Sequence, residues 1–190
     1  MDDSSQARRA MVDSQLRPEA VTNAAVLAAM GSVTREDHVP AVSRSLAYVD
    51  RAVPLGDGRS MMPPAAIGRL LSELAPRPGE RALVVASAGG YAAALLRVIG
   101  CDVTELDGID AGKVAKDFDL MLIDGAAEEL PSALLSKVTP HGRIGLALAD
   151  RGVTRLAIGT VAAGRPAFRT IVDADVGLIP GFERAKSFAF

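Results

Sequence analysis

Short apolar runs alternate with glycine turns and helical segments through the middle of the chain. Residues 82–86 are rich in Val and Leu, which is typical of a strand buried on both faces of a parallel sheet. A turn of small residues follows over 87–90, and residues 91–99 predict a helix that ends at Gly100. A second strand is expected over 102–106. Strand, turn, helix and strand in this order predict the first half of a nucleotide-binding α/β sheet.

The same patterns predict elements on either side of this unit. Residues 8–48 are expected to form an N-terminal cap of short helical pieces, after a polar, frayed stretch over 1–7. A loop over 50–64 leads to an amphipathic helix over 65–75, and the apolar run 118–123 predicts a strand parallel to the first strand and beside it. Strands that follow one another without helices imply antiparallel pairing at the end of the sheet. The later elements are a helix over 131–138 and strands over 143–149, 153–161, 166–172 and 187–190.

These elements predict one α/β domain over residues 1–190, with a mostly parallel sheet in its core over 81–190 and helices on both sides. Only ten residues, 108–117, separate the second strand from the third. One βαβ unit takes roughly thirty residues, so these ten encode no further strand. Fully extended, these ten residues reach at most about 33 Å. That length is enough for the diagonal of about 20 Å from the end of the second strand, past one neighbouring strand, to the start of the third. We therefore expect the strand over 102–106 to be the edge of the sheet.

Composition narrows the class of protein. Hydrophobic residues make up 49% of the 190 residues and aromatic residues 4%, without Trp, which excludes disorder and predicts a core of Ala, Val and Leu. The net charge of −2, with both signs spread along the chain, gives no electrostatic footprint for nucleic acid. With no secretory signal and no apolar run near eighteen residues, we expect a soluble cytoplasmic protein without membrane contact. The single cysteine, Cys101, is interpreted as a packed residue rather than a nucleophile.

Some of the candidate chemistry follows from the residues themselves. Asp107 ends the second strand, where an acid is placed to bind ribose hydroxyls. Residues 86–91 carry alanine where a dinucleotide fingerprint has its first two glycines, and each methyl group hinders the approach of a ligand to the backbone. Asp124, Glu128 and Glu129 follow the third strand. We interpret them as solvated or capping acids and expect no metal site.

Six motifs follow one another along the chain: MVDSQLRPEAVTNAAVLAAM, VTREDHVP, AYVDRAVPLGDGRS, RPGERALVVASAGGYAAALL, FDLMLIDGAAEELPSALLSKVTPHGRIGLAL and IPGFERAKSFAF. Through them, residues 11–190 resemble the protein-L-isoaspartate O-methyltransferase family, particularly its compact bacterial members. The resemblance implies a Rossmann-like class I methyltransferase fold with S-adenosylmethionine as the cofactor. It also implies protein repair, in which the carboxylate of an L-isoaspartyl residue in a damaged polypeptide attacks the sulfonium methyl group. A carboxylate is already ionised at pH 7, so the enzyme would align and desolvate it.

The resemblance assigns a catalytic loop to residues 60–64, which read Ser-Met-Met-Pro-Pro. Ser60 matches the first hydroxyl of the family loop and is the candidate catalytic residue. Met62 stands where the family has the serine expected to hold the reacting carboxylate, and Pro63 replaces a glutamine. A thioether donates no hydrogen bond, so the carboxylate would lose a fixed donor.

The resemblance also assigns a cofactor loop. The candidate cofactor-binding residues are Ser87, Gly89, Gly90, Asp107 and Asp124. Val84 stands where the family has an acid that anchors the amino-acid part of the cofactor, and alanines replace glycines at 86 and 88. Residues 108–117 are too few for the adenine pocket. These losses together are expected to exceed about 4 kcal/mol, which is about a thousandfold in affinity for S-adenosylmethionine.

Three functions stay open at this point. The chain is an active isoaspartyl methyltransferase, a non-catalytic protein-interaction module on the same fold, or a sensor that binds S-adenosylmethionine or a nucleotide without turnover. We predict a degenerate family member, a pseudoenzyme with weak or no activity, whose partner is a polypeptide substrate or another protein. A homodimer is left open. These hypotheses differ in what they predict for the cleft beside Gly89 and Asp107, which is either open or filled by side chains.

Overall fold

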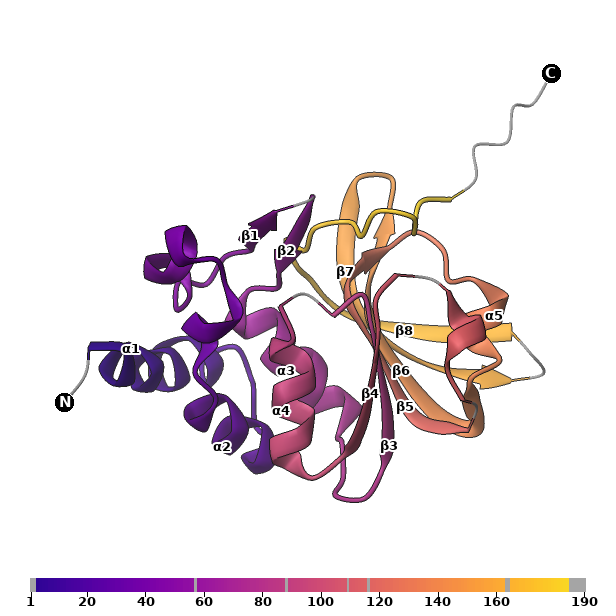
Figure 1. Ribbon diagram of the computed structural model, residues 1–190, viewed down its shortest axis with the longest axis horizontal. Helices are drawn as coiled ribbons and strands as arrows, with labels where there is room; N and C mark the ends of the chain where they lie inside the picture. Colours follow the sequence, from indigo (N-terminus) through magenta and orange to yellow (C-terminus); the bar gives the residue numbers. More distant parts are fainter. Residues whose placement is uncertain are drawn as a thin grey trace.

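A six-stranded sheet in the order β4-β3-β5-β6-β7-β8 forms the centre of the computed structural model (Figure 1), which describes residues 3–56, 58–87, 89–108, 110–115, 117–162 and 165–184. The first four strands run parallel, and β7 and β8 are added antiparallel. The predicted fold class, a mostly parallel sheet with antiparallel C-terminal strands, is confirmed. The strands are β3 (Arg81–Val85), β4 (Asp102–Leu106), β5 (Phe118–Ala127), β6 (Val138–Asp150), β7 (Val153–Ala162) and β8 (Arg165–Asp173).

The strands at the centre of the sheet pair as the sequence predicts. Strand β5 pairs with β3 in parallel, with Ala82 opposite Leu120 and Val85 opposite Ile123. Strand β4 pairs with the other side of β3 and is the edge of the sheet. Among the described residues of 108–117 there is no strand, only the short 3₁₀ helix η4 (Ala111–Lys113). The short connection therefore crosses β3 as expected.

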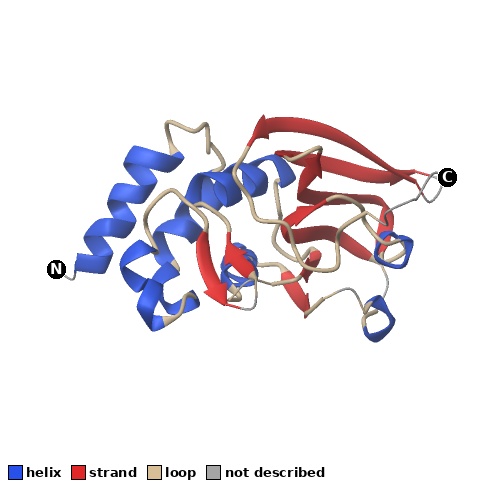
Figure 2. Cartoon of the chain, turned by 90° about the horizontal axis from the view of Figure 1, so that it is seen from above, coloured by secondary structure: helices blue, strands red, loops and turns tan. Residues whose placement is uncertain are grey.

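Side chains alternate between two hydrophobic clusters, one on each face of the sheet, as the two-residue period of a strand requires. Ala82 and Val84 lie in the cluster under the N-terminal helices, whereas Leu83 and Val85 lie in the cluster on the opposite face. Helices α1 to α4 lie on the first face and α5 on the second, and Figure 2 shows the N-terminal helices gathered to one side of the strands. The helices are α1 (Asp3–Met11), α2 (Ala24–Ser32), α3 (Pro64–Leu74), α4 (Tyr91–Ile99) and α5 (Ser132–Leu135).

Several boundaries differ from the predictions. Helix α1 begins at Asp3 rather than Arg8, because Asp3 and the pair Arg8 and Arg9 complement the dipole at its two ends. A π-helical turn, η1 (Val12–Leu16), continues it. The predicted loop over 50–64 contains a hairpin of β1 (Val53–Gly56) and β2 (Arg59–Met61).

On the second face, α5 is one turn long instead of spanning 131–138, and β6 begins at Val138. Strand β5 extends to Ala127, because the main chain near Ala126 pairs with β6 and also with the segment around Leu178. The strand predicted over 187–190 lies outside the described residues. In the described ranges, no helix is long and apolar enough to span a bilayer.

Candidate functional site

The predicted site residues gather at the carboxyl ends of β3, β4 and β5, where open α/β sheets bind ligands. The turn after β3 leads directly into α4, and Gly89 and Gly90 have φ angles of 69° and 76°, which favour glycine. Ala86 also has a positive φ, 55°, although it carries a methyl group. That conformation costs an alanine about 1–2 kcal/mol. The described part of the turn therefore has positive φ angles at residues 86, 89 and 90, with alanine at the first of them.

The 3₁₀ helix η2 (Arg35–His38) covers this turn. His38 Nδ1 donates a hydrogen bond to the carbonyl oxygen of Gly89 at 2.7 Å, and the His38 ring packs edge-on against Tyr91 with centroids 5.5 Å apart. A Cβ atom placed on Gly89 would lie 2.2 Å from the His38 carbonyl oxygen. The backbone of η2 therefore lies against Gly89 on the side where a side chain would project, while Gly89 itself is exposed.

Arg35, fully buried, joins this cover to the catalytic loop. Its Nε donates to the carbonyl oxygen of Ala47 at 2.6 Å, its Nη2 donates to the carbonyl oxygen of Met62, and its guanidinium lies 4.7 Å from the centre of the Tyr91 ring. Burial lowers the pKa of Arg35, an effect that Tyr91 and Asp124 partly offset. One buried cation thus ties the N-terminal cap, the catalytic loop and the start of α4 together.

Asp107, the candidate ribose-binding acid, pairs with a residue of β2. Arg59 Nη1 lies 2.9 Å from Asp107 Oδ1, and the Asp107 side chain is 87% exposed. An acid this exposed has no enclosing wall beside it. A ribose would have to compete with Arg59 for the carboxylate.

Ser60, Ala86 and Asp124 come together around a cavity of about 10 Å³, closed on its remaining side by residues 177–179. That segment is fixed by two backbone hydrogen bonds of 2.9 Å, from Ala126 N to Gly177 O and from Ile179 N to Ala126 O. The volume holds about one water molecule, whereas sites for small ligands measure about 300–1,000 Å³. Residues 177–179 therefore lie directly against the candidate catalytic serine and the candidate cofactor acid.

The two residues that depart most from the family pattern lie in the core. Met62 is 2% exposed and Val84 is fully buried, both in the cluster under the N-terminal helices. Neither lines the small cavity. Their side chains stabilise packing and present no polar group to a ligand.

Ser87, in the same turn, is half-buried beside Glu105 of β4. Partial burial by itself would raise the pKa of Glu105, but the hydrogen bond and the positive charge of Arg97 outweigh it and lower the pKa. The Arg97 Nη2 to Glu105 Oε1 distance is 2.7 Å. The hydroxyl of Ser87 is buried and has no hydrogen-bond partner among the described residues.

Several residues that contact the site were given no role from the sequence alone. His38 is half-buried at the end of η2 and bonds Gly89. Arg59 and residues 177–179 carried no expectation. The signal lay in the motifs themselves, since VTREDHVP contains Arg35 and His38.

The acids after β5 serve structural contacts where their partners are seen. Glu128 Oε2 accepts a hydrogen bond from the backbone N–H of Arg184 at 2.7 Å. Within the described part of the chain, no group of three or more His, Cys, Asp or Glu side chains is arranged to hold a metal ion.

The Cys101 thiol is expected to react slowly with alkylating agents. Burial, reinforced by the negative charge of Glu80, raises the pKa of Cys101 to about 11, and the residue is 7% exposed. At pH 8 only about one thiol in a thousand is then ionised, and the thiolate is the reactive form. Iodoacetamide labelling at pH 8 should proceed at least about a hundredfold more slowly than in denaturant, with a rate that rises up to about pH 11. Equal rates in the folded and unfolded chain would contradict this.

Comparison with known proteins identifies a family and several relatives that this chain resembles. The sequence model of the family described as Protein-L-isoaspartate(D-aspartate) O-methyltransferase (PCMT) matches residues 6–114. A protein-L-isoaspartate O-methyltransferase of Methylorubrum extorquens is 30% identical, over 94% of this chain and 89% of the relative. A protein-L-isoaspartate O-methyltransferase 2 of Anaeromyxobacter is 32% identical, over 83% of this chain and 76% of the relative.

Solved structures show the same fold. A putative protein-L-isoaspartate O-methyltransferase from Plasmodium falciparum, in complex with S-adenosyl-L-homocysteine, aligns with a TM-score of 0.74 at 15% identity, over 90% of this chain and 97% of that one. A second protein-L-isoaspartate O-methyltransferase aligns with a TM-score of 0.76 at 14% identity, over 92% of this chain and 66% of that one.

Proposed function

Because the chain belongs to the protein-L-isoaspartate O-methyltransferase family, we propose that it is a degenerate member whose S-adenosylmethionine site is closed by its own residues. In this proposal it transfers methyl groups to isoaspartyl carboxylates weakly or not at all. The observation that carries the proposal is the cavity of about 10 Å³ between Ser60, Ala86 and Asp124. S-adenosylmethionine, an amino acid joined to a nucleoside, does not fit there.

Each part of the cofactor would meet an obstacle. At the turn, the His38 carbonyl group lies on the Cβ side of Gly89 and narrows the directions from which a ligand reaches the backbone. At the ribose position, Asp107 is paired with Arg59 and lacks an enclosing wall. At the amino-acid position, the fully buried Val84 offers no charge or hydrogen bond. The residues present therefore do not fit the cofactor in this conformation, and we derive no reaction step through it.

The substrate side of the site has also lost a polar group. The serine that the family is expected to use for the reacting carboxylate is replaced by Met62, which is buried in the core. Ser60 keeps its hydroxyl at the small cavity, but a Cβ atom on Gly177 would lie 2.8 Å from Ser60 Oγ, so the C-terminal segment lies close against it. A single hydroxyl in this position aligns a carboxylate poorly. These features equally suit a non-catalytic module that binds a protein partner, because such binding need not use the cofactor site.

Calorimetry with S-adenosylmethionine and S-adenosylhomocysteine tests the proposal. We expect affinities at least about a thousandfold weaker than those of an intact family member titrated in parallel. A radiolabel transfer assay on an isoaspartyl peptide, with the same member as a positive control, should give no incorporation above background. Micromolar binding of either compound, or methyl transfer comparable to that of the control enzyme, would overturn it.

A further inference from the structure

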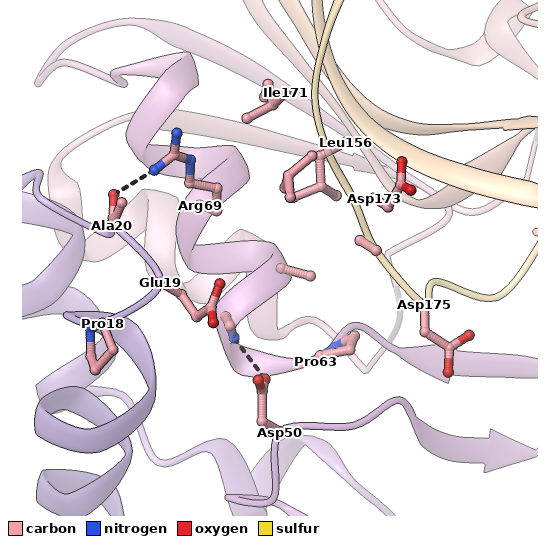
Figure 3. A pocket seen from close by; sticks show the side chains of 14 residues that line it. Pro18, Glu19, Ala20, Asp50, Pro63, Arg69, Leu156, Ile171, Asp173 and Asp175 are labelled. Atoms are coloured by element: carbon pink, nitrogen blue, oxygen red, sulfur yellow. Dashed lines mark hydrogen bonds between the residues drawn. The ribbon is translucent and has the colours of Figure 1, made fainter.

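A groove of about 500 Å³ lies outside the candidate cofactor site, between the start of α3, the turn after η1 and the ends of β7 and β8 (Figure 3). It shares no lining residue with the small cavity at Ser60. Its volume falls within the usual range for binding sites. Whatever the groove binds, its function is independent of whether methyl transfer has been lost.

The groove combines apolar walls with an excess of negative charge. Its lining carries four carboxylates, at Glu19, Asp50, Asp173 and Asp175, and one guanidinium, at Arg69. Apolar surface lies between these charges. It comes mainly from Pro18 and Ile171, since Pro63, Ala66 and Leu156 in the lining are buried.

Three of the charged groups are already used within the protein. Asp50 Oδ1 accepts a hydrogen bond of 3.0 Å from the backbone N–H of Ala65, and Asp173 pairs with Arg155 at 2.9 Å. Arg69 donates to the carbonyl oxygen of Ala20 at 3.0 Å (Figure 3). It also pairs with Glu73 at 3.2 Å. The guanidinium is therefore held on one wall by its own partners.

Two carboxylates remain. Among the residues that the structure describes, the side chains of Glu19 and Asp175 have no hydrogen bond or ion pair. They come from segments far apart in sequence, and Figure 3 shows both beside the groove. The wall that carries Asp175 is fixed, because Ala174 N donates to Thr154 O at 3.0 Å and Thr154 Oγ1 donates to the Ala174 carbonyl oxygen.

We propose that this groove binds a segment of a partner polypeptide that carries a lysine or arginine flanked by aliphatic residues. The unpaired carboxylates of Glu19 and Asp175 attract the cationic head group, and the aliphatic stem packs against exposed apolar surface at Pro18 and Ile171, as long basic side chains do on mixed surfaces. A groove of this volume admits the neighbouring residues as well as one side chain. Charge complementarity gives the site its preference and makes the affinity depend on salt.

The probe is the peptide acetyl-Ala-Leu-Lys-Leu-Ala-amide, titrated into the full chain and followed by NMR chemical shifts. We expect shifts at residues that line the groove, binding at least about fivefold weaker when norleucine replaces the lysine, and weaker binding as salt increases. Shifts that are absent at millimolar peptide, that lie elsewhere, or that are equal for both peptides would overturn the proposal.

The double variant Glu19→Gln with Asp175→Asn removes the two unpaired charges. We expect about a tenfold loss of affinity for the lysine peptide. The matched control, Asp102→Asn with Glu129→Gln, changes the net charge equally at two exposed or half-exposed acids outside the groove and should leave binding within about twofold. Equal losses of affinity in both variants would mean that the effect comes from the change in net charge, and this result would overturn the proposed site. Binding of spermidine as tight as that of the peptide would instead assign the groove to small cations.

Discussion

Replacing Arg35 with methionine is expected to lower the free energy of unfolding by about 3 kcal/mol. The side chain is fully buried, and its removal leaves the carbonyl oxygens of Ala47 and Met62 without their donor. It also leaves the buried Asp124 without the positive charge that Arg35 provides. Methionine keeps much of the volume, so the loss reports mainly on polar contacts. Urea unfolding followed by circular dichroism measures it.

Arg44→Met is the matched control for this variant. Arg44 lies in η3 (Ala41–Leu46), the 3₁₀ helix that follows η2, and its side chain is exposed. Its replacement should change stability by less than about 0.5 kcal/mol. If the two variants unfold at the same urea concentration, Arg35 does not tie the cap to the catalytic loop as described.

The second large effect is expected at the glycine turn, where Gly89→Ala should destabilise the fold by about 2–4 kcal/mol. Part of this cost, about 1–2 kcal/mol, comes from a side chain in the left-handed region. The rest comes from the clash of the new methyl group with the His38 carbonyl oxygen, 2.2 Å away, which forces η2 off the turn.

Gly90→Ala separates the two contributions. Gly90 has nearly the same φ angle, but a Cβ atom there would meet only the Glu105 and His38 side chains, at 3.8 Å. This variant should show the backbone cost alone. Denaturant midpoints for both proteins give the difference, and identical midpoints would mean that η2 does not rest on the turn.

The order of the elements could be predicted where the signal is local. Helix α4 and strand β4 begin and end at the expected residues, because an Ala- and Leu-rich run is stopped by Gly100, which adopts the left-handed conformation of a helix end. The edge position of β4 followed from the length of the segment after it. The candidate site residues Ser60, Ser87, Gly89, Gly90, Asp107 and Asp124 were placed at one end of the sheet by the family motifs, and their roles remain predictions.

The contacts around the glycine turn and Asp107 could not be predicted, because they join distant parts of the chain. His38 and Gly89 are 51 residues apart, and Arg59 and Asp107 are 48 residues apart. No periodicity or turn rule acts over such separations. The start of α1 and the hairpin of β1 and β2 were missed for a related reason, since polar or proline-containing segments acquire regular structure only from their surroundings.

The contact between η2 and the glycine turn has a consequence for how this fold responds to its surroundings. A protein that binds a ligand in its native state gains stability with ligand concentration, about 2.7 kcal/mol at a hundred times the dissociation constant. The side chains of His38 and Arg59, which contact Gly89 and Asp107, belong to the same chain and are therefore always present. The reinforcement they give this end of the sheet is therefore constant, and it does not rise or fall with the metabolite supply of the cell.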